Sequence, residues 1–298
     1  MAVPTEGIVP GVLEPAVVAP APGEGGRLGR LRVLGGIWLP AFLVAAIFFL
    51  CFLWPVIGPV PGPTGGSILN SNDPSFAPGH LFGTDATGND EWSRLLYGGR
   101  ASLEVSLAVT GLGLLIGGML GAFAGYVGGW RDGLIMRVLD VLIAFPALVL
   151  AVAIAERLGP GELHAIWALS FFSVPAFGRL ARAATLRVRE QNFIVAARLS
   201  GTGHLRMLVG HVVPNILPEL VTFGLLGMGI IIVLEGALSF IGLGIPPPAP
   251  SWGNMIASGE GILSAQPKFV LLPSAALFIT VVSLNLLGES LRARWSAR

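Results

Sequence analysis

The sequence predicts an all-α polytopic membrane protein with six transmembrane helices. Of its 298 residues, 53% are hydrophobic and only 12% are charged, whereas soluble domains carry roughly a quarter charged residues. A helix needs about 20 apolar residues to cross a bilayer. Six crossings place both termini on the same side of the membrane. Apolar stretches of suitable length cover residues about 33–57, 103–127, 138–156, 163–180, 216–243 and 271–291.

The positions of the basic residues predict that both termini are cytoplasmic. With the N-terminus inside, 14 of the 18 Lys and Arg residues fall in inner segments and four fall in outer segments. Such an excess in the inner loops is what the positive-inside rule describes. Residues 181–214 therefore face the cytoplasm, and residues 58–100 and 244–270 face the outside.

The two ends of the chain are expected to be tails. Residues 1–32 begin as a low-complexity run of Pro, Gly, Ala, Val and Glu, with no basic residue before Arg27. They are expected to be a disordered cytoplasmic tail rather than a secretory signal, whose basic residues would come first. Residues 293–298 are expected to form the C-terminal tail. The single cysteine, Cys51, lies in the span 33–57 and is expected to be a buried apolar side chain.

The outer loops are rich in turn-forming residues. Pro, Gly and Asp break up residues 58–90, and Trp92–Tyr97 is expected to form a short helix lying at the membrane interface. The second loop is stiffened by several prolines and holds an aromatic residue suited to the headgroup region. These loops either receive a substrate-delivery protein or only connect the helices. The candidate docking residues are Asp85, Asp90, Trp92 and Trp252.

The sequence argues against catalysis. A P-loop requires Gly-Lys-Ser/Thr, but the only lysine, Lys268, follows Pro267. The four histidines form no HExxH motif, although His204 and His211 are seven residues apart and share a helical face if that segment is helical. No Gly-x-Ser-x-Gly elbow is present. We therefore expect no enzyme activity, no cofactor or metal site, and no nucleic-acid partner.

A stripe of glycines marks a helix that packs closely against another. Gly113, Gly117, Gly121 and Gly125 recur every four residues in the span 103–127, and small residues at this spacing let helix backbones approach in lipid. Packing within the chain is the favoured interpretation, and pairing with another subunit is the alternative.

Two acidic residues are candidates for structural or translocation roles. Glu235 lies towards the outer end of the span 216–243, and a carboxylate in mid-membrane costs about 2.5–3.5 kcal/mol on insertion scales. We expect it to face a protein interior or the translocation path and to be hydrogen-bonded. A proton relay through it would instead make the chain a proton-coupled secondary transporter. Asp140 is expected to form an i,i+3 ion pair with Arg137.

The cytoplasmic loop carries a pattern with a mechanical interpretation. Ala196 and Ala197 are small enough for a short helix to enter a narrow groove on a partner. Gly201 is expected to end that helix in the left-handed conformation. Pro214 is expected to mark the start of the next membrane helix. Arg198 and Arg206 would lie at the rim.

This loop resembles the cytoplasmic "EAA" loop of ABC-importer permeases. Further blocks resemble the "C" subunit of the dipeptide/oligopeptide/nickel permease family. Asn89, Val195 and Glu289 depart from that family's pattern and leave the substrate open. The matching blocks are His80–Asp85 with Gly88 and Asp90, Gly99–Leu103, Gly128–Asp132, Asp140–Pro146, Glu235–Gly244, Ser251–Met255 and Asn285–Arg292.

The resemblance implies a type I ABC importer transmembrane domain over residues 101–292, in the cytoplasmic membrane of a bacterium. It implies half of a translocation pathway for di- or oligopeptides, with nickel or another small solute as the alternative. The implied partners are a homologous second permease, two ATPase subunits that bind ATP and Mg, an extracytoplasmic substrate-binding protein and membrane lipid. Within the 193–214 loop, the residues implied to couple to the ATPases are Ala196, Ala197, Arg198, Gly201, Thr202, His211 and Pro214.

Overall fold

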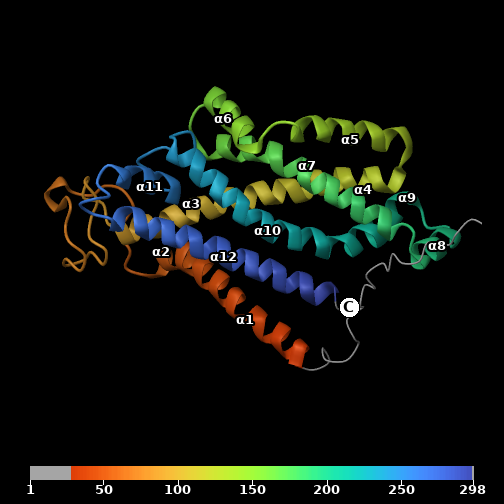
Figure 1. The fold of residues 1–298 in the computed structure, drawn as a ribbon, viewed down its shortest axis with the longest axis horizontal. Coiled ribbons are helices and arrows are strands. Elements are labelled where there is room, and N and C mark those ends of the chain that lie inside the picture. Colours follow the sequence, from red (N-terminus) through yellow and green to blue (C-terminus); the bar gives the residue numbers. More distant parts are fainter. Residues whose placement is uncertain (1–27, 297–298) are drawn as a thin grey trace, which may run out of the picture.

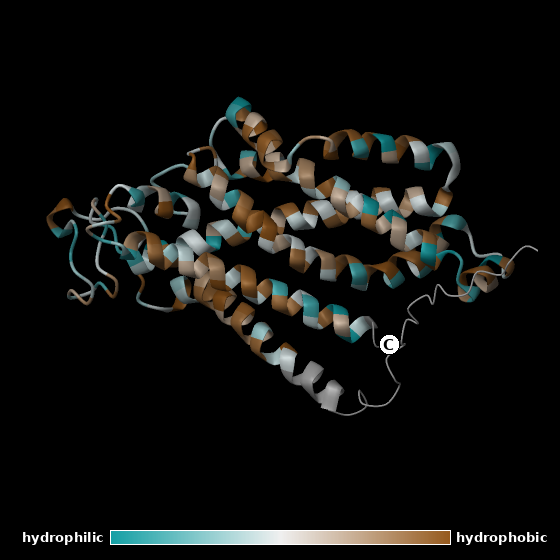
Figure 2. Ribbon diagram, in the orientation of Figure 1, coloured by the Kyte–Doolittle hydropathy of each residue, from teal (hydrophilic) through white to brown (hydrophobic). Residues whose placement is uncertain are grey.

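The computed structural model describes residues 28–296, which fold into a bundle of long helices running along one axis (Figure 1). Apolar residues fill the middle of the bundle and polar residues gather at its two ends (Figure 2). The helices are α1 (Leu28–Phe48), α2 (Trp54–Ile57), α3 (Glu91–Leu112), α4 (Gly118–Val127), α5 (Gly129–Ile143), α6 (Ala147–Leu158), α7 (Glu162–Val188), α8 (Asn192–Leu199), α9 (His204–Met207), α10 (Val213–Phe240), α11 (Trp252–Glu260) and α12 (Lys268–Ser296).

Five helical segments in the described part of the chain are long and apolar enough to cross a membrane, and a bent pair brings the number to six. Three of the five are continuous through a π-helical turn. These turns cover Phe49–Leu53, Gly113–Gly117 and Leu208–Val212. The predicted all-helical membrane fold is confirmed, and the six predicted spans are reached when the bent pair counts as one span.

The tails are shorter than the sequence suggests. Of the predicted tail 1–32, residues 1–27 lie outside the described residues, and residues 28–32 already belong to α1. At the other end α12 continues to Ser296, which takes in most of the predicted tail 293–298; residues 297 and 298 lie outside the described residues.

The prediction of a separate interfacial helix at Trp92–Tyr97 is wrong. These residues form the first turns of a 37-residue helical segment, Glu91–Val127, that continues into the membrane. Asp90 begins it as N-cap, with its Oδ2 accepting a hydrogen bond from the Ser93 amide at 2.7 Å. The charged residues at the start of this segment end the apolar run in the sequence but do not end the helix.

The third predicted span, about 138–156, is not continuous. α5 and α6 meet at a bend of 82° across Ala144–Pro146. A proline disfavours the helical conformation of the residue before it and cannot donate a backbone hydrogen bond. α6 therefore begins only after Pro146 and packs back on α7, as Figure 1 shows.

The fifth span begins earlier than predicted. Pro214 lies at the start of α10 as predicted, but α9 and the π-turn continue the helix backwards, so that His204–Phe240 form one 37-residue segment. Pro214 directly follows the π-turn Leu208–Val212, and the Asn215 side chain donates to the His211 carbonyl at 2.6 Å. The helix passes Pro214 because the wider turn and this side chain rearrange the local hydrogen bonds.

The glycine stripe brings α4 and the preceding π-turn into backbone contact with α7. A Cβ on Gly117 would overlap the carbonyl of Val174, and one on Gly121 would overlap the carbonyl of Gly178. At Gly125 the added atom would lie 2.8 Å from the Arg182 carbonyl oxygen. The favoured interpretation, packing within the chain, is confirmed.

We expect Gly121→Ala to destabilise the bundle by about 1–3 kcal/mol, because the added methyl group overpacks the contact with α7. Thermal unfolding of the detergent-solubilised chain measures the effect. Gly111→Ala is the matched control, since an added Cβ there meets nothing within 4 Å. Equal melting temperatures for the two variants would contradict the close contact.

Candidate functional site

The candidate functional residues gather at opposite ends of the bundle. α8 projects from one end, whereas α11 and the loops before α3 and after α10 cover the other (Figure 1). The positive-inside bias assigns the α8 end to the cytoplasm.

α8 is a short helix closed by a complete C-terminal cap. Gly201 has φ +81°, the left-handed conformation that glycine adopts without strain. The Gly201 amide donates to the Arg198 carbonyl and the Thr202 amide to the Ala197 carbonyl, each at 3.1 Å. This pair of bonds is a Schellman motif, which satisfies carbonyls that the helix end leaves free. The predicted helix end at Gly201 is confirmed.

α8 is held to the bundle on one side only. Ile194 is fully buried and belongs to an apolar cluster with Met207, Val212 and residues of α7 and α10. Ala197 packs partly against the same cluster, whereas Ala196 is exposed. The two alanines therefore do not lie on one free face, and only Ala196 is open to a partner.

The side of α8 that faces away from the bundle, together with the start of α9, exposes apolar side chains, which the loop motif did not predict. Leu199 is 84% exposed and Leu205 is 76% exposed, and Phe193 and Val195 are also exposed. Such side chains outside the membrane mark surfaces that other proteins cover. Their position in a cytoplasmic loop with five arginines is the sequence signal that could have identified them.

The other predicted coupling residues lie further along the chain. Arg198 is exposed on α8, whereas His211 lies in the π-turn Leu208–Val212 and Pro214 follows it. At the start of α9, the His204 ring meets the Tyr126 hydroxyl at 3.1 Å. This contact joins the end of α4 to the segment that follows α8.

Ion pairs brace the helices above α8. Arg182 of α7 donates to both carboxylate oxygens of Asp132 at 2.6 and 2.7 Å. Arg187 donates from one nitrogen, Nη2, to both oxygens of Glu219 of α10, at 2.7 and 2.5 Å. The Arg182–Asp132 pair uses two nitrogens and is bidentate, a geometry that fixes orientation as well as distance. The two ion pairs tie α5 and α10 to α7, whose end leads directly into α8.

The predicted pairing of Asp140 with Arg137 is wrong. The Asp140 carboxylate lies 3.9 Å from Arg179 of α7, and both side chains are more than half exposed. The Asp140 side chain therefore faces α7 and not Arg137 of its own helix, α5. An exposed pair at this distance contributes little to stability.

Glu235 lies in the protein interior and is fully buried. Its Oε1 accepts a hydrogen bond from Ser239 at 2.6 Å, and Ser102 of α3 faces the same carboxylate. The Ser239 oxygen in turn accepts from the Ile245 amide at 3.1 Å. Glu235 thus holds the turn that follows α10 and does not face an open path.

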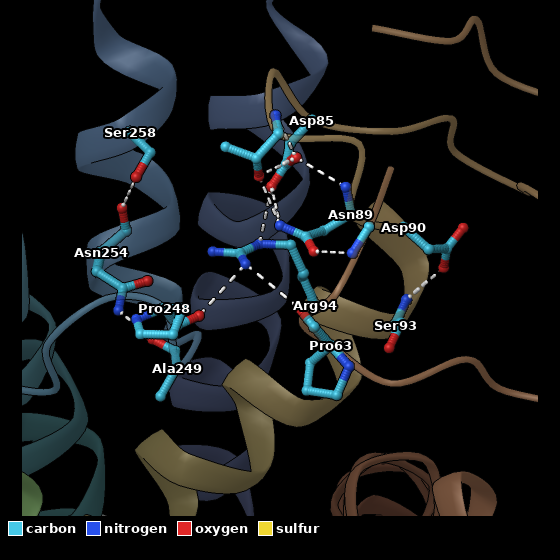
Figure 3. A network of polar contacts seen from close by, with 12 residues as sticks. Pro63, Asp85, Asn89, Asp90, Ser93, Arg94, Pro248, Ala249, Asn254 and Ser258 are labelled. Atoms are coloured by element: carbon cyan, nitrogen blue, oxygen red, sulfur yellow. Dashed lines mark hydrogen bonds and ion pairs between the residues drawn. The ribbon is translucent and has the colours of Figure 1, made fainter. Parts of the chain in front are cut away.

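At the outer end, Asp85 organises the loop that leads into α3. Its Oδ1 accepts hydrogen bonds from the Thr87 amide, the Thr87 hydroxyl and the Asn89 amide, at 2.7–2.9 Å. Its Oδ2 lies 3.4 Å from Arg94 Nε (Figure 3). Burial raises the pKa of Asp85, but the hydrogen bonds from Thr87 and Asn89 and the charge of Arg94 together lower it below its usual value.

Arg94 connects the two outer loops. Its Nη1 donates to the carbonyl of Pro63 in the first loop, at 3.3 Å, and to that of Pro248 in the second, at 3.4 Å (Figure 3). The residue is 8% exposed. In the sequence, Arg94 is marked only as a basic residue four positions after Asp90. Its carbonyl partners, Pro63 and Pro248, are distant in the sequence and could not be identified from it.

The other predicted docking residues are less accessible. Asp90 is buried and meets the His80 ring at 2.8 Å while capping α3. Trp92 is half-buried, with its ring edge-to-face against Phe82. Trp252 was predicted to lie at the level of the headgroups, but its side chain is only 2% exposed. It packs beside Gly99 and Cys51, and its indole N–H donates a hydrogen bond to the Leu95 carbonyl at 3.0 Å. Trp252 is therefore a core residue, and its assignment as a docking residue is wrong.

We expect Asp85 to stabilise the loop above pH 4 and to lose this effect as the pH falls further. A carboxyl group whose pKa is lowered on folding stabilises the folded form above its usual pKa, here 3.8, and no longer does so below the folded value. Amide hydrogen exchange of residues 85–94, corrected for intrinsic rates, should show protection over Asp85→Asn at pH 7. A difference that stays constant as the pH falls below 4 would contradict this.

We expect Trp252→Ala to lower stability by about 3–5 kcal/mol, because it empties a fully packed site. The measurement is thermal unfolding in detergent. Trp130→Ala, on α5, is the control, since Trp130 is 74% exposed. If both variants unfold at the same temperature, Trp252 is not part of the core.

Comparison with known proteins identifies the family. Residues 117–298 match the family described as binding-protein-dependent transport system inner membrane component. The chain is 37% identical over 271 residues to a dipeptide transport system permease protein of Alkalihalophilus pseudofirmus, covering 89% of this chain and 85% of the relative.

Two glutathione transport system permease proteins are also similar. The one from Pectobacterium atrosepticum is 39% identical over 72% of this chain and 71% of its own length. The one from Escherichia coli is 41% identical over 74% of this chain and 73% of its own length. With its membrane-spanning helices, this chain belongs to the binding-protein-dependent inner-membrane permeases of ABC importers and is a multi-pass protein of the bacterial cytoplasmic membrane.

Proposed function

We propose that this chain forms half of the translocation pathway of a peptide importer and that α8 is the helix through which separate ATPase subunits drive it. The observation that carries the proposal is a capped helix, anchored at Ile194, that presents exposed apolar side chains at the cytoplasmic end. In this proposal the chain itself is not catalytic, and the ATPase subunits bind ATP and Mg.

The geometry of α8 suits the transmission of force. Its N-terminus follows α7 after three residues, and its cap leads into the segment that begins at His204. The contact of Gly201 and Thr202 with the last turn makes the helix end rigid. A partner that moves α8 would therefore move α7 and α10 together, because Ile194 of α8 packs in one apolar cluster with residues of both helices.

In our proposal the apolar face makes the contact, and the predicted motif residues shape it. Leu199, Phe193 and Ala196 would enter the partner's groove, with Arg198 at the rim. Gly201 and Thr202 would set the shape of the cap, whereas His211 and Pro214 would act in the helix that follows. Gly117, Gly121 and Gly125 would carry the movement into α7 through backbone contact.

The proposed substrate is a di- or oligopeptide, supported by the names of the dipeptide and glutathione permeases to which the chain is similar. The remaining proposed partners are a homologous second permease, which would complete the pathway, and an extracytoplasmic substrate-binding protein. The latter would meet the exposed parts of the outer loop, such as Ile68, Leu69 and Phe76, and the Asp85 turn. A nickel or other small-solute importer is the alternative.

We expect Leu199→Asp to reduce ATPase association at least about tenfold and to abolish peptide uptake, because a charge would be buried at a contact surface. Insertion and melting temperature should be unchanged, since the residue is 84% exposed. Copurification of ATPase subunits from the native membrane, with ATPase and uptake assays, measures this.

Leu69→Asp is the matched control. Leu69 is 94% exposed in the outer loop, at the opposite end of the bundle from α8, so it should retain ATPase subunits. Normal ATPase binding and uptake by Leu199→Asp would rule out α8 as the coupling surface. Uptake by the wild-type chain alone, without any ATPase, would point to the proton-coupled alternative.

A further inference from the structure

A cavity of about 440 Å³ lies at the outer end of the bundle, between the Asp85–Arg94 segment, the turn at Pro247 and Pro248, and α11. Figure 3 shows its wall, with Asp85 and Arg94 on one side and Pro248 and Ser258 on the other. Exposed Ala86, Thr87 and Ser258 line it as well, so it opens to the outside. Its volume lies within the range of small-molecule sites.

Glu91 is the unusual residue in this wall. It is only 2% exposed, yet no hydrogen bond or ion pair reaches its carboxylate from any residue in the described part of the chain. A buried charged group without a hydrogen bond is costly, and native structures almost always pair such groups. The carboxylate therefore calls for a donor that enters the cavity.

The neighbouring cations do not supply this donor. Arg94 and Lys268 are close enough to act on Glu91 through charge. However, Arg94 directs its Nε to Asp85 and its Nη1 to the carbonyls of Pro63 and Pro248. Lys268 donates to the Phe82 carbonyl at 3.0 Å and lies over the Phe269 ring. Both are engaged with the loops that shape the cavity.

The charges of the wall select the kind of ligand. Two carboxylates, Asp85 and Glu91, line the cavity with the guanidinium of Arg94, and Lys268 lies near Glu91. Because Asp85 already faces Arg94, Glu91 is the acceptor left for a ligand. This favours a hydrogen-bond donor over an anion, and the two nearby cations oppose a divalent cation. Met255, Ile262 and Phe269 supply apolar surface beside these groups. A group with several N–H donors on an apolar stem fits both properties.

We propose that this cavity binds the ammonium group of a small organic solute, with Glu91 as its hydrogen-bond acceptor. The assignment of the N-terminal ammonium of a short peptide as that group rests on the proposed function. The site lies within this one subunit, so it would hold a peptide at the outer face.

Binding is tested with the full chain in lipid nanodiscs, using saturation-transfer NMR with the dipeptide Ala-Ala and with N-acetyl-Ala-Ala. We expect saturable binding of Ala-Ala and at least about tenfold weaker binding of the acetylated peptide, which has no ammonium group. Glu91→Gln should weaken Ala-Ala binding by a similar factor. Glu104→Gln, on the same helix but ion-paired with Arg100, should bind as the wild type does.

A second variant guards against misfolding of Glu91→Gln. Ser258→Phe changes an exposed residue of the opposite wall and should exclude the peptide by filling the cavity. Equal binding of both peptides, absence of saturable binding, or wild-type binding by both variants would overturn the inference. Peptide uptake by the assembled transporter, measured in parallel, tests the proposed function separately, because uptake can persist when this site fails.

Discussion

The backbone contact between α4 and α7 is the constraint on which the rest of the bundle depends. Gly117 and Gly121 leave no side chain between the two helices, so their carbonyls and Cα atoms meet directly. Lipid offers no hydrophobic drive for such association, and close van der Waals packing takes its place. The helix fixed in this way is α7. Its Arg182 pairs with Asp132 of α5 and its Arg187 with Glu219 of α10, and its C-terminus leads into α8. A side chain at Gly117 or Gly121 would overlap the backbone of α7 and force the two helices apart.

The buried polar side chains near the outer end of the bundle form hydrogen bonds that fix turns of the chain. Glu235 and Ser239 fix the chain after α10, and Asn254 of α11 donates to the carbonyls of Ile245 and Ala249 in the same turn. These bonds hold a proline-rich segment whose prolines cannot form them for themselves. In the described residues, side chains of α10 and α11 thus fix the turn that forms one wall of the cavity beside Pro248.

Local signals in the sequence predicted local features well. Gly201 ends α8 because a left-handed residue is required there, and the glycine period identified a packing face that the structure confirms. Helix boundaries failed where composition and conformation diverge: Glu91–Tyr97 is polar but helical, and Ala144–Pro146 is apolar but bent. Trp252 was misplaced because its burial depends on Gly99 and Cys51, far away in the sequence. The cavity beside Glu91 joins loops more than 150 residues apart, so no pattern in the sequence could reveal it.

Arg94 makes the two outer loops a single mechanical unit. Because one guanidinium holds the carbonyls of Pro63 and Pro248 at once, neither loop can shift without straining the other. Arg94 itself lies in the first turn of α3, so both loops are fastened to the outer end of the helical segment that continues through the π-turn to Val127. The outer surface and this membrane-crossing segment therefore share one polar joint.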